Sequence, residues 1–85
     1  MEYYLFAFES THGAITSKKN LEKEIDLVMM PTLREITSSC GISLRIEPKD
    51  LARAKQLMEE SGITGYALYM VREKEVKCIS ECKKE

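Results

Sequence analysis

The stretch Ile42-Ser43-Leu44-Arg45-Ile46 decides the fold, because apolar and polar residues alternate strictly along it. Successive side chains of a β-strand point to opposite faces of the sheet, so this alternation predicts a strand with one buried face. Pro48 follows shortly afterwards, and proline suits the first turn of a helix. The stretch therefore predicts a strand that leads directly into a helix.

Working outward from this stretch, aromatic and apolar runs predict further strands on both sides. With the central one, we expect strands over residues 3–8, 27–30, 42–46 and 65–71. Apolar residues at helical spacing predict a helix between the first two strands and another between the last two. The first helix begins at Ser10 or Thr11, the second ends at Gly62, and their expected inner faces are Ala14, Leu21 and Ile25, and Leu51, Ala54 and Met58.

This β-α-β-β-α-β order predicts an α+β fold of the ferredoxin-like type, an antiparallel sheet with both helices on one face. We expect a single domain over residues 1–72, followed by a charged C-terminal tail over residues 73–85 that contains two cysteines. No segment of the sequence is predicted to cover the other face of the sheet. Dimerisation through that face is therefore expected.

Composition excludes several classes of function. The chain has 85 residues and a formal net charge of −1, with no basic patch interleaved with aromatic residues, so we expect no nucleic-acid partner. Its apolar runs are of strand length and too short to span a bilayer. Because Met1-Glu2-Tyr3 leads at once into a strand, without a basic signal region, we expect a cytoplasmic protein with no membrane partner.

The segment Thr37-Ser38-Ser39-Cys40-Gly41 is the leading candidate for chemistry. Small residues leave room around a thiol, and hydroxyl or guanidinium groups can stabilise its thiolate, which is the reactive form. Arg34 and Arg45 lie close in sequence. We therefore interpret Cys40 as the reactive residue, with Arg34, Ser38, Ser39 and Gly41 as its supporting loop and Arg45 as an accessory.

A structural role for Cys40 is the alternative interpretation. Turns rich in serine are common, and a single cysteine often behaves as a small buried apolar side chain. Cys40 also shares the parity of Ile42 and Leu44, so a regular strand would point it inward. Residue types and spacing alone leave both roles open.

The run Pro31-Thr32-Leu33-Arg34-Glu35-Ile36-Thr37-Ser38-Ser39-Cys40-Gly41 resembles the signature of the bacterial and archaeal selenium/sulfur carrier-like proteins. Phe8-Glu9-Ser10-Thr11-His12 and Leu44-Arg45-Ile46-Glu47-Pro48 also fit, and the resemblance covers about residues 3–70. It implies that Cys40 carries sulfur or selenium as a persulfide or selenosulfide. One departure is Leu33, near which a second proline is expected in the family pattern.

The resemblance also implies protein partners, namely a sulfur or selenium donor of the cysteine desulfurase type and an acceptor. Such a carrier turns over only with its partners, so we expect a non-enzymatic protein without a cofactor. The residues alone leave two other hypotheses open. One is a small ligand-binding or regulatory module, in which Arg34 and the serines hold an anion and Cys40 is structural.

The second open hypothesis is a metal-binding domain that uses the C-terminal cysteines, Cys78 and Cys82. On a helix their spacing would place both sulfurs on one face. They could also form a reversible disulfide, provide a resolving thiol for Cys40, or be incidental. His12 is a further accessory candidate, as a base toward Cys40, although an exposed polar residue in the first helical turn is the simpler interpretation.

Overall fold

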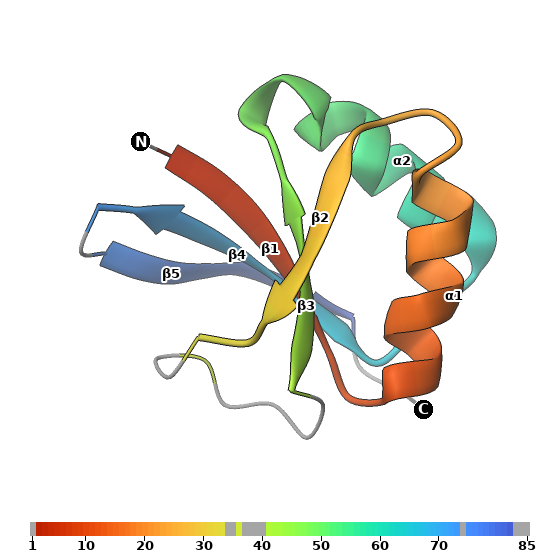
Figure 1. Ribbon diagram of the computed structural model, residues 1–85, viewed down its shortest axis with the longest axis horizontal. Helices are drawn as coiled ribbons and strands as arrows, with labels where there is room; N and C mark the ends of the chain where they lie inside the picture. The colour runs from red at the N-terminus through yellow and green to blue at the C-terminus, as the bar shows by residue number, and fades with distance from the viewer. Residues whose placement is uncertain (1, 34–35, 37–40, 74, 83–85) are drawn as a thin grey trace.

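Five antiparallel strands form one sheet in the part of the chain that the structure describes (Figure 1). This computed structural model describes residues 2–33, 36, 41–73 and 75–82, with Cys82 described by its backbone alone. The order across the sheet is β2-β3-β1-β4-β5. In chain order the elements are β1 (Glu2–Phe8), α1 (Thr11–Leu21), β2 (Leu27–Pro31), β3 (Ile42–Ile46), the 3-10 turn η1 (Pro48–Asp50), α2 (Leu51–Ser61), β4 (Tyr66–Arg72) and β5 (Glu75–Cys82).

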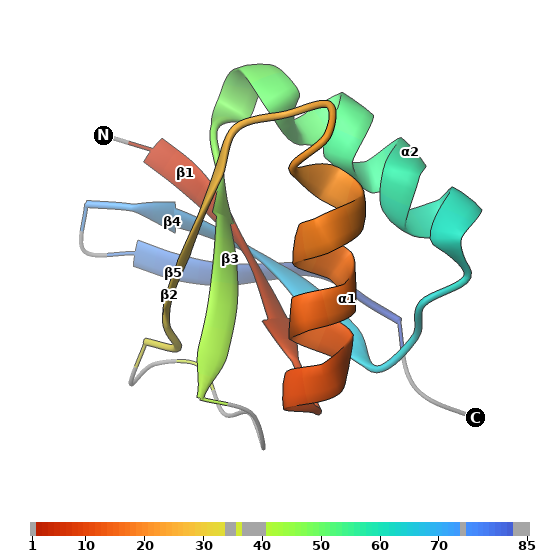
Figure 2. The ribbon, with the colours of Figure 1, turned by 45° about the vertical axis from the view of Figure 1, so that its right-hand side comes forward.

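Both helices pack on the same face of the sheet (Figure 2). The main apolar core lies between them and alternate residues of the strands, because every second side chain of a strand points to this side. Phe6 and Phe8 contribute the largest buried side chains. The rings of Tyr66 and Phe6 pack edge to face, with their centroids 5.6 Å apart. The α+β class, the antiparallel sheet and the helix-covered face are thus as the sequence predicts.

Local signals set the ends of the two helices. Ser10 begins α1, since its hydroxyl accepts a hydrogen bond of 3.1 Å from the Gly13 N–H. Gly62 ends α2 in the left-handed conformation at φ 73°, as expected for a glycine at this position. Ile25 is buried as predicted, but it lies beyond the end of α1 in the turn that leads to β2. Helical spacing therefore identified its burial but extended the helix by one turn.

The opposite face of the sheet, called here the helix-free face, is partly covered. It is formed by Tyr3, Leu5, Ala7, Val28, Met30, Ser43, Arg45, Ala67, Tyr69, Val71 and Val76. Ile36 from the β2–β3 connection joins a second buried cluster here with Leu5, Ala7 and Val71. The prediction that no segment covers this face is therefore wrong, because the connection itself supplies an apolar residue to it.

A fifth strand corrects the predicted topology. The sequence predicts four strands and a charged tail over residues 73–85, whereas Glu75–Cys82 form β5 and pair with β4. The exact ferredoxin-like arrangement is therefore not matched, since that has four strands. The register between β4 and β5 shifts at Leu68/Tyr69, so β5 contains a bulge at Ile79.

Candidate functional site

The ends of the β2–β3 connection are held together by hydrogen bonds. The Thr32 N–H donates to the Gly41 carbonyl at 3.0 Å, which continues the β2–β3 ladder one pair beyond Pro31 and Ile42. The hydroxyl oxygens of Thr32 and Ser43 lie 2.8 Å apart and share a hydrogen bond. The segment 33–40, which contains Cys40, therefore starts and finishes at a fixed point at one end of the sheet.

Small side chains make room for this connection on the helix-free face. Ser43, Ala7 and Ala67 are consecutive neighbours across β3, β1 and β4, and they form a row with little side-chain volume. Ile36 is only 5% exposed and belongs to the same buried cluster as Ala7. Its N–H also donates to the Leu33 carbonyl at 3.0 Å. Ile36 is thus anchored to the sheet by apolar contacts.

Replacing Ile36 by alanine is expected to lower the free energy of unfolding by about 2 kcal/mol, because a buried aliphatic side chain is lost beside residues too small to fill the space. Urea unfolding measures the change. The amide of residue 36 should also exchange faster with solvent, while the Thr32 amide, which is bonded in the ladder, should keep its protection. Equal stability of variant and wild type would show that Ile36 does not anchor the connection.

Most of the predicted supporting loop lies outside the described residues, namely Arg34, Ser38, Ser39 and Cys40 itself. Gly41 is described and exposed. A Cβ atom at Gly41 would meet no heavy atom of the described residues within 4 Å. A side chain at this position would therefore contact none of the residues that the structure describes.

Arg45 lies on the helix-free face, where its guanidinium stacks 4.4 Å above the ring of Tyr3. Its Nη2 is 3.6 Å from Glu47 Oε1, and its buried Nε has no hydrogen-bond partner in the described structure. Four residues of extended strand separate it from Gly41, about 13 Å between Cα atoms. The contacts of Arg45 thus engage it with Tyr3 and Glu47.

His12 is exposed in the first turn of α1. Helix α1 begins at the end of the sheet where β2 ends and β3 begins (Figure 1). However, α1 packs on the helix-covered face, whereas Ile36 of the connection is buried on the other face. The sheet thus separates His12 from the anchored part of the connection.

Cys78 is an exposed free thiol in β5, directly opposite Tyr69 of β4. Tyr69 is part of the helix-free face, so Cys78 lies at the margin of the face that holds Ile36. Burial raises the pKa of Tyr69 above its usual value, and the neighbouring Cys78 and Glu81 raise it further. The fold therefore places the Cys78 thiol beside the Tyr69 phenol.

Because its pKa is raised in the folded state, Tyr69 contributes stability that is complete below about pH 10 and is lost as the pH rises through the folded-state pKa. Replacing Cys78 by serine should lower the Tyr69 pKa without returning it to the ordinary value, since burial is the larger cause. NMR titration of the ring carbons of Tyr69 measures this. An unchanged titration in the variant would contradict the contact between the two side chains.

Cys78 and Cys82 lie farther apart on a strand than they would on a helix. Both lie in β5, where Cys78 pairs with Tyr69 and Cys82 with Tyr66. Because of the bulge at Ile79, the two cysteines span only the three-residue step from Tyr69 to Tyr66 of β4, so their Cα atoms lie about 10 Å apart. A disulfide requires less than about 7 Å, and two thiolates on one zinc ion must each approach it to about 2.3 Å. The helical interpretation of this pair, with both sulfurs on one face, is therefore wrong.

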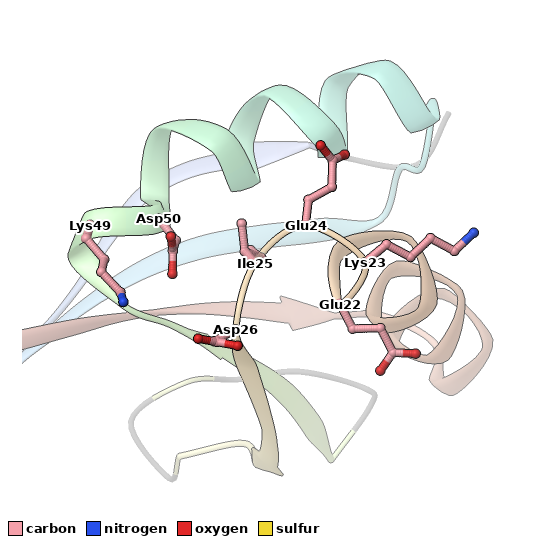
Figure 3. Close-up of a pocket in the computed structure, with 7 residues that line it drawn as sticks. All are labelled: Glu22, Lys23, Glu24, Ile25, Asp26, Lys49 and Asp50. Atoms are coloured by element: carbon pink, nitrogen blue, oxygen red, sulfur yellow. The ribbon is translucent and has the colours of Figure 1, made fainter.

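A hollow of about 250 Å³ lies at the other end of β2, beside η1 (Figure 3). Its rim combines acidic and basic side chains, and two of its carboxylates are already paired, Glu22 with Lys18 and Glu24 with Arg53. In the described residues no group of three or more His, Cys, Asp or Glu side chains could hold a metal ion. The hollow is lined by Glu22, Lys23, Glu24, Ile25, Asp26, Lys49 and Asp50.

Sequence reasoning missed the residues that position the connection, Thr32, Ile36 and Ser43. Ser43 was assigned only to a polar strand position, yet it is buried and bonded to Thr32. The available signal was Ile36, the one apolar residue in the sequence from Arg34 to Ser39. None of the described helices is both long and apolar enough to cross a membrane.

Comparison with known proteins agrees with the resemblance seen in the sequence. The family described as "Putative Se/S carrier protein-like" matches residues 3–70, from β1 through most of β4. No curated protein and no solved structure matches the chain. The matched residues include the whole β2–β3 connection and leave out β5. The chain therefore belongs to the Se/S carrier protein-like family.

Proposed function

We propose that the chain is a cytoplasmic carrier that holds sulfur or selenium on Cys40 and passes it between proteins. Membership of the Se/S carrier protein-like family is the observation that carries this proposal. The family match includes the segment that the sequence singles out, Thr37-Ser38-Ser39-Cys40-Gly41. The protein acts as a carrier and not as an enzyme, and it needs no cofactor of its own.

The transfer step is a thiolate displacement. The Cys40 thiolate attacks the terminal sulfur of a persulfide on a donor protein, a new S–S bond forms at Cys40, and the donor cysteine leaves as its thiolate. No external oxidant is needed, because the outer sulfur moves without a net change in oxidation state. A selenosulfide donor transfers its terminal selenium in the same way. An acceptor nucleophile reverses the step and regenerates the Cys40 thiolate.

The described geometry supports this role in two respects. The segment that bears Cys40 begins and ends on a fixed pair, Thr32 and Gly41, at one end of the sheet. Gly41, which follows Cys40 in the sequence, adds no side chain, and no atom of the described residues lies within 4 Å of a Cβ placed there. In the proposed carrier, Arg34, Ser38 and Ser39 stabilise the thiolate by charge and hydrogen bonds.

Of the accessory candidates, Cys78 has the best support from the fold. It lies at the margin of the helix-free face, on which Ile36 of the same connection is buried. His12 belongs to α1 on the other side of the sheet. A thiol at position 78 could resolve a persulfide on Cys40, returning sulfur as hydrosulfide and leaving an intramolecular disulfide.

Intact mass spectrometry tests the proposal. The wild-type protein is incubated with a cysteine desulfurase and cysteine, with the three cysteines otherwise reduced. The expected result is a mass increase of one sulfur atom that disappears on treatment with a reductant and does not form on protein alkylated beforehand. Peptide mapping should place the sulfur on Cys40. No adduct with the active desulfurase would contradict the carrier function and favour a structural Cys40 in a ligand-binding module.

A further inference from the structure

The two edges of the sheet differ in how well they are protected from pairing with another strand. Edge strand β5 contains a bulge and carries the charged residues Glu75, Lys77 and Glu81, and both features discourage edge-to-edge pairing. Edge strand β2, Leu27–Pro31, carries no charge and pairs with β3 in an uninterrupted register. Val28 and Met29 are 59% and 37% exposed. Among the described residues, the outer edge of β2 therefore has no partner strand and presents an apolar pairing surface.

Hydrogen bonding in the β2–β3 ladder identifies the backbone groups that β2 directs away from β3. The bond from the Thr32 N–H to the Gly41 carbonyl makes this a hydrogen-bonded pair of the antiparallel ladder. Such pairs alternate with non-hydrogen-bonded ones, whose N–H and C=O groups point away from the partner strand. By this alternation the outward groups belong to Leu27, Met29 and Pro31. Proline has no N–H, so the edge presents two donors, at Leu27 and Met29.

We propose that β2 pairs antiparallel with β2 of a second copy of this chain, about a twofold axis at Met29. The Met29 N–H groups then donate to each other's Met29 carbonyls across the axis. The Leu27 N–H donates to the carbonyl of Pro31 in the second copy. Both outward donors of β2 gain acceptors, and the missing N–H of Pro31 leaves no donor unpaired. The two sheets join into one continuous sheet.

In this register the apolar side chains of β2 in one copy lie beside apolar side chains of β2 in the other. On the helix-free face, Val28 of each copy lies beside Met30 of the other, and on the other face the two Met29 side chains meet. No like charges are opposed along the strand, because it carries none. The chain's net charge of −1 adds little long-range repulsion between copies. An uncharged, self-matching edge thus favours a second copy over a charged partner strand.

Sedimentation of the full chain over about a hundredfold dilution tests the proposal. The wild type should shift between 9.8 kDa and twice that mass. Met29→Lys places two ammonium groups opposite each other at the axis and should raise the dimer dissociation constant at least about tenfold. Ile79→Lys, at a residue 45% exposed on the other edge, is the matched control and should leave dimerisation unchanged.

Val28→Lys is the second variant, because a residue so exposed in the monomer tolerates a charge without loss of folding. It too should weaken the dimer. A wild type that stays monomeric at every concentration would overturn the proposal, even if β2 binds an extended strand of another protein. Dimers that persist in both β2 variants would also overturn the proposal. An equal increase of the dimer dissociation constant in Ile79→Lys would do the same. This proposal is independent of carrier chemistry, which the mass of the Cys40 adduct tests.

Discussion

Replacing Cys40 by serine is expected to abolish the persulfide adduct that forms with a cysteine desulfurase and cysteine. The displacement step requires a thiolate, and a serine hydroxyl is not ionised near neutral pH, so it cannot take over the sulfur. Serine is close to cysteine in size, which makes this the smallest change that removes the chemistry. Intact mass after a fixed incubation measures the fraction of protein carrying sulfur, and the variant should show none.

The matched control for this experiment is Cys78→Ser. Cys78 is an exposed thiol on edge strand β5, outside the region of the family match, so its replacement should leave the initial transfer to Cys40 intact. If Cys78 resolves the persulfide, the adduct should accumulate to a higher level in this control. An adduct that persists in Cys40→Ser, or that depends on Cys78 alone, would remove Cys40 from the role of carrier.

Replacing Phe6 by alanine is expected to cost about 3–5 kcal/mol of the free energy of unfolding. Phe6 lies in the central strand β1, fully buried under the helices, and its ring meets those of Phe8 and Tyr66. A chain of this length has a total stability of about 4–13 kcal/mol, so much of it rests on this side chain. Chemical denaturation followed by circular dichroism measures the loss.

Ile15→Ala is the control for the core substitution, because Ile15 is an exposed apolar residue of α1. Its replacement should change the free energy of unfolding by no more than about 0.5 kcal/mol. If Phe6→Ala were no more harmful than Ile15→Ala, the main core would not lie between the helices and β1. The contrast therefore tests the layer arrangement as well as one residue.

Hydrophobic periodicity was sufficient to predict most of the fold. The alternation of Ile42–Ile46 and the apolar run of β1 identified strands, because each strand is buried on at least one face. Strand β5 was not predicted, since its charged residues indicate a solvated segment. An edge strand tolerates such charges, and the bulge at Ile79 interrupts the alternation that would have revealed it.

The candidate site was predictable only in its residue types. The motif around Cys40 and the family resemblance identified the segment, and the family match confirmed the resemblance. The anchoring of Ile36 against Leu5 and Ala7 was not predictable, because it joins residues that are distant in sequence. Local patterns contain no information about which exposed-looking apolar residue will fold back onto the sheet. The sequence does not show that Ala7 lies between Ser43 and Ala67 in the sheet, where its small side chain leaves space for Ile36.

The bond between Thr32 and Gly41 closes the sheet ladder at the two ends of the segment that contains Cys40. Insertions within 37–40, beyond the buried Ile36, therefore need not shift the register of any strand, since loop length costs little free energy once its ends are fixed. Evolution could reshape this segment for new partner proteins while the rest of the sequence remained under separate selection for folding. The same hairpin offers protein engineers a natural junction for exchanging the connection between β2 and β3 for another.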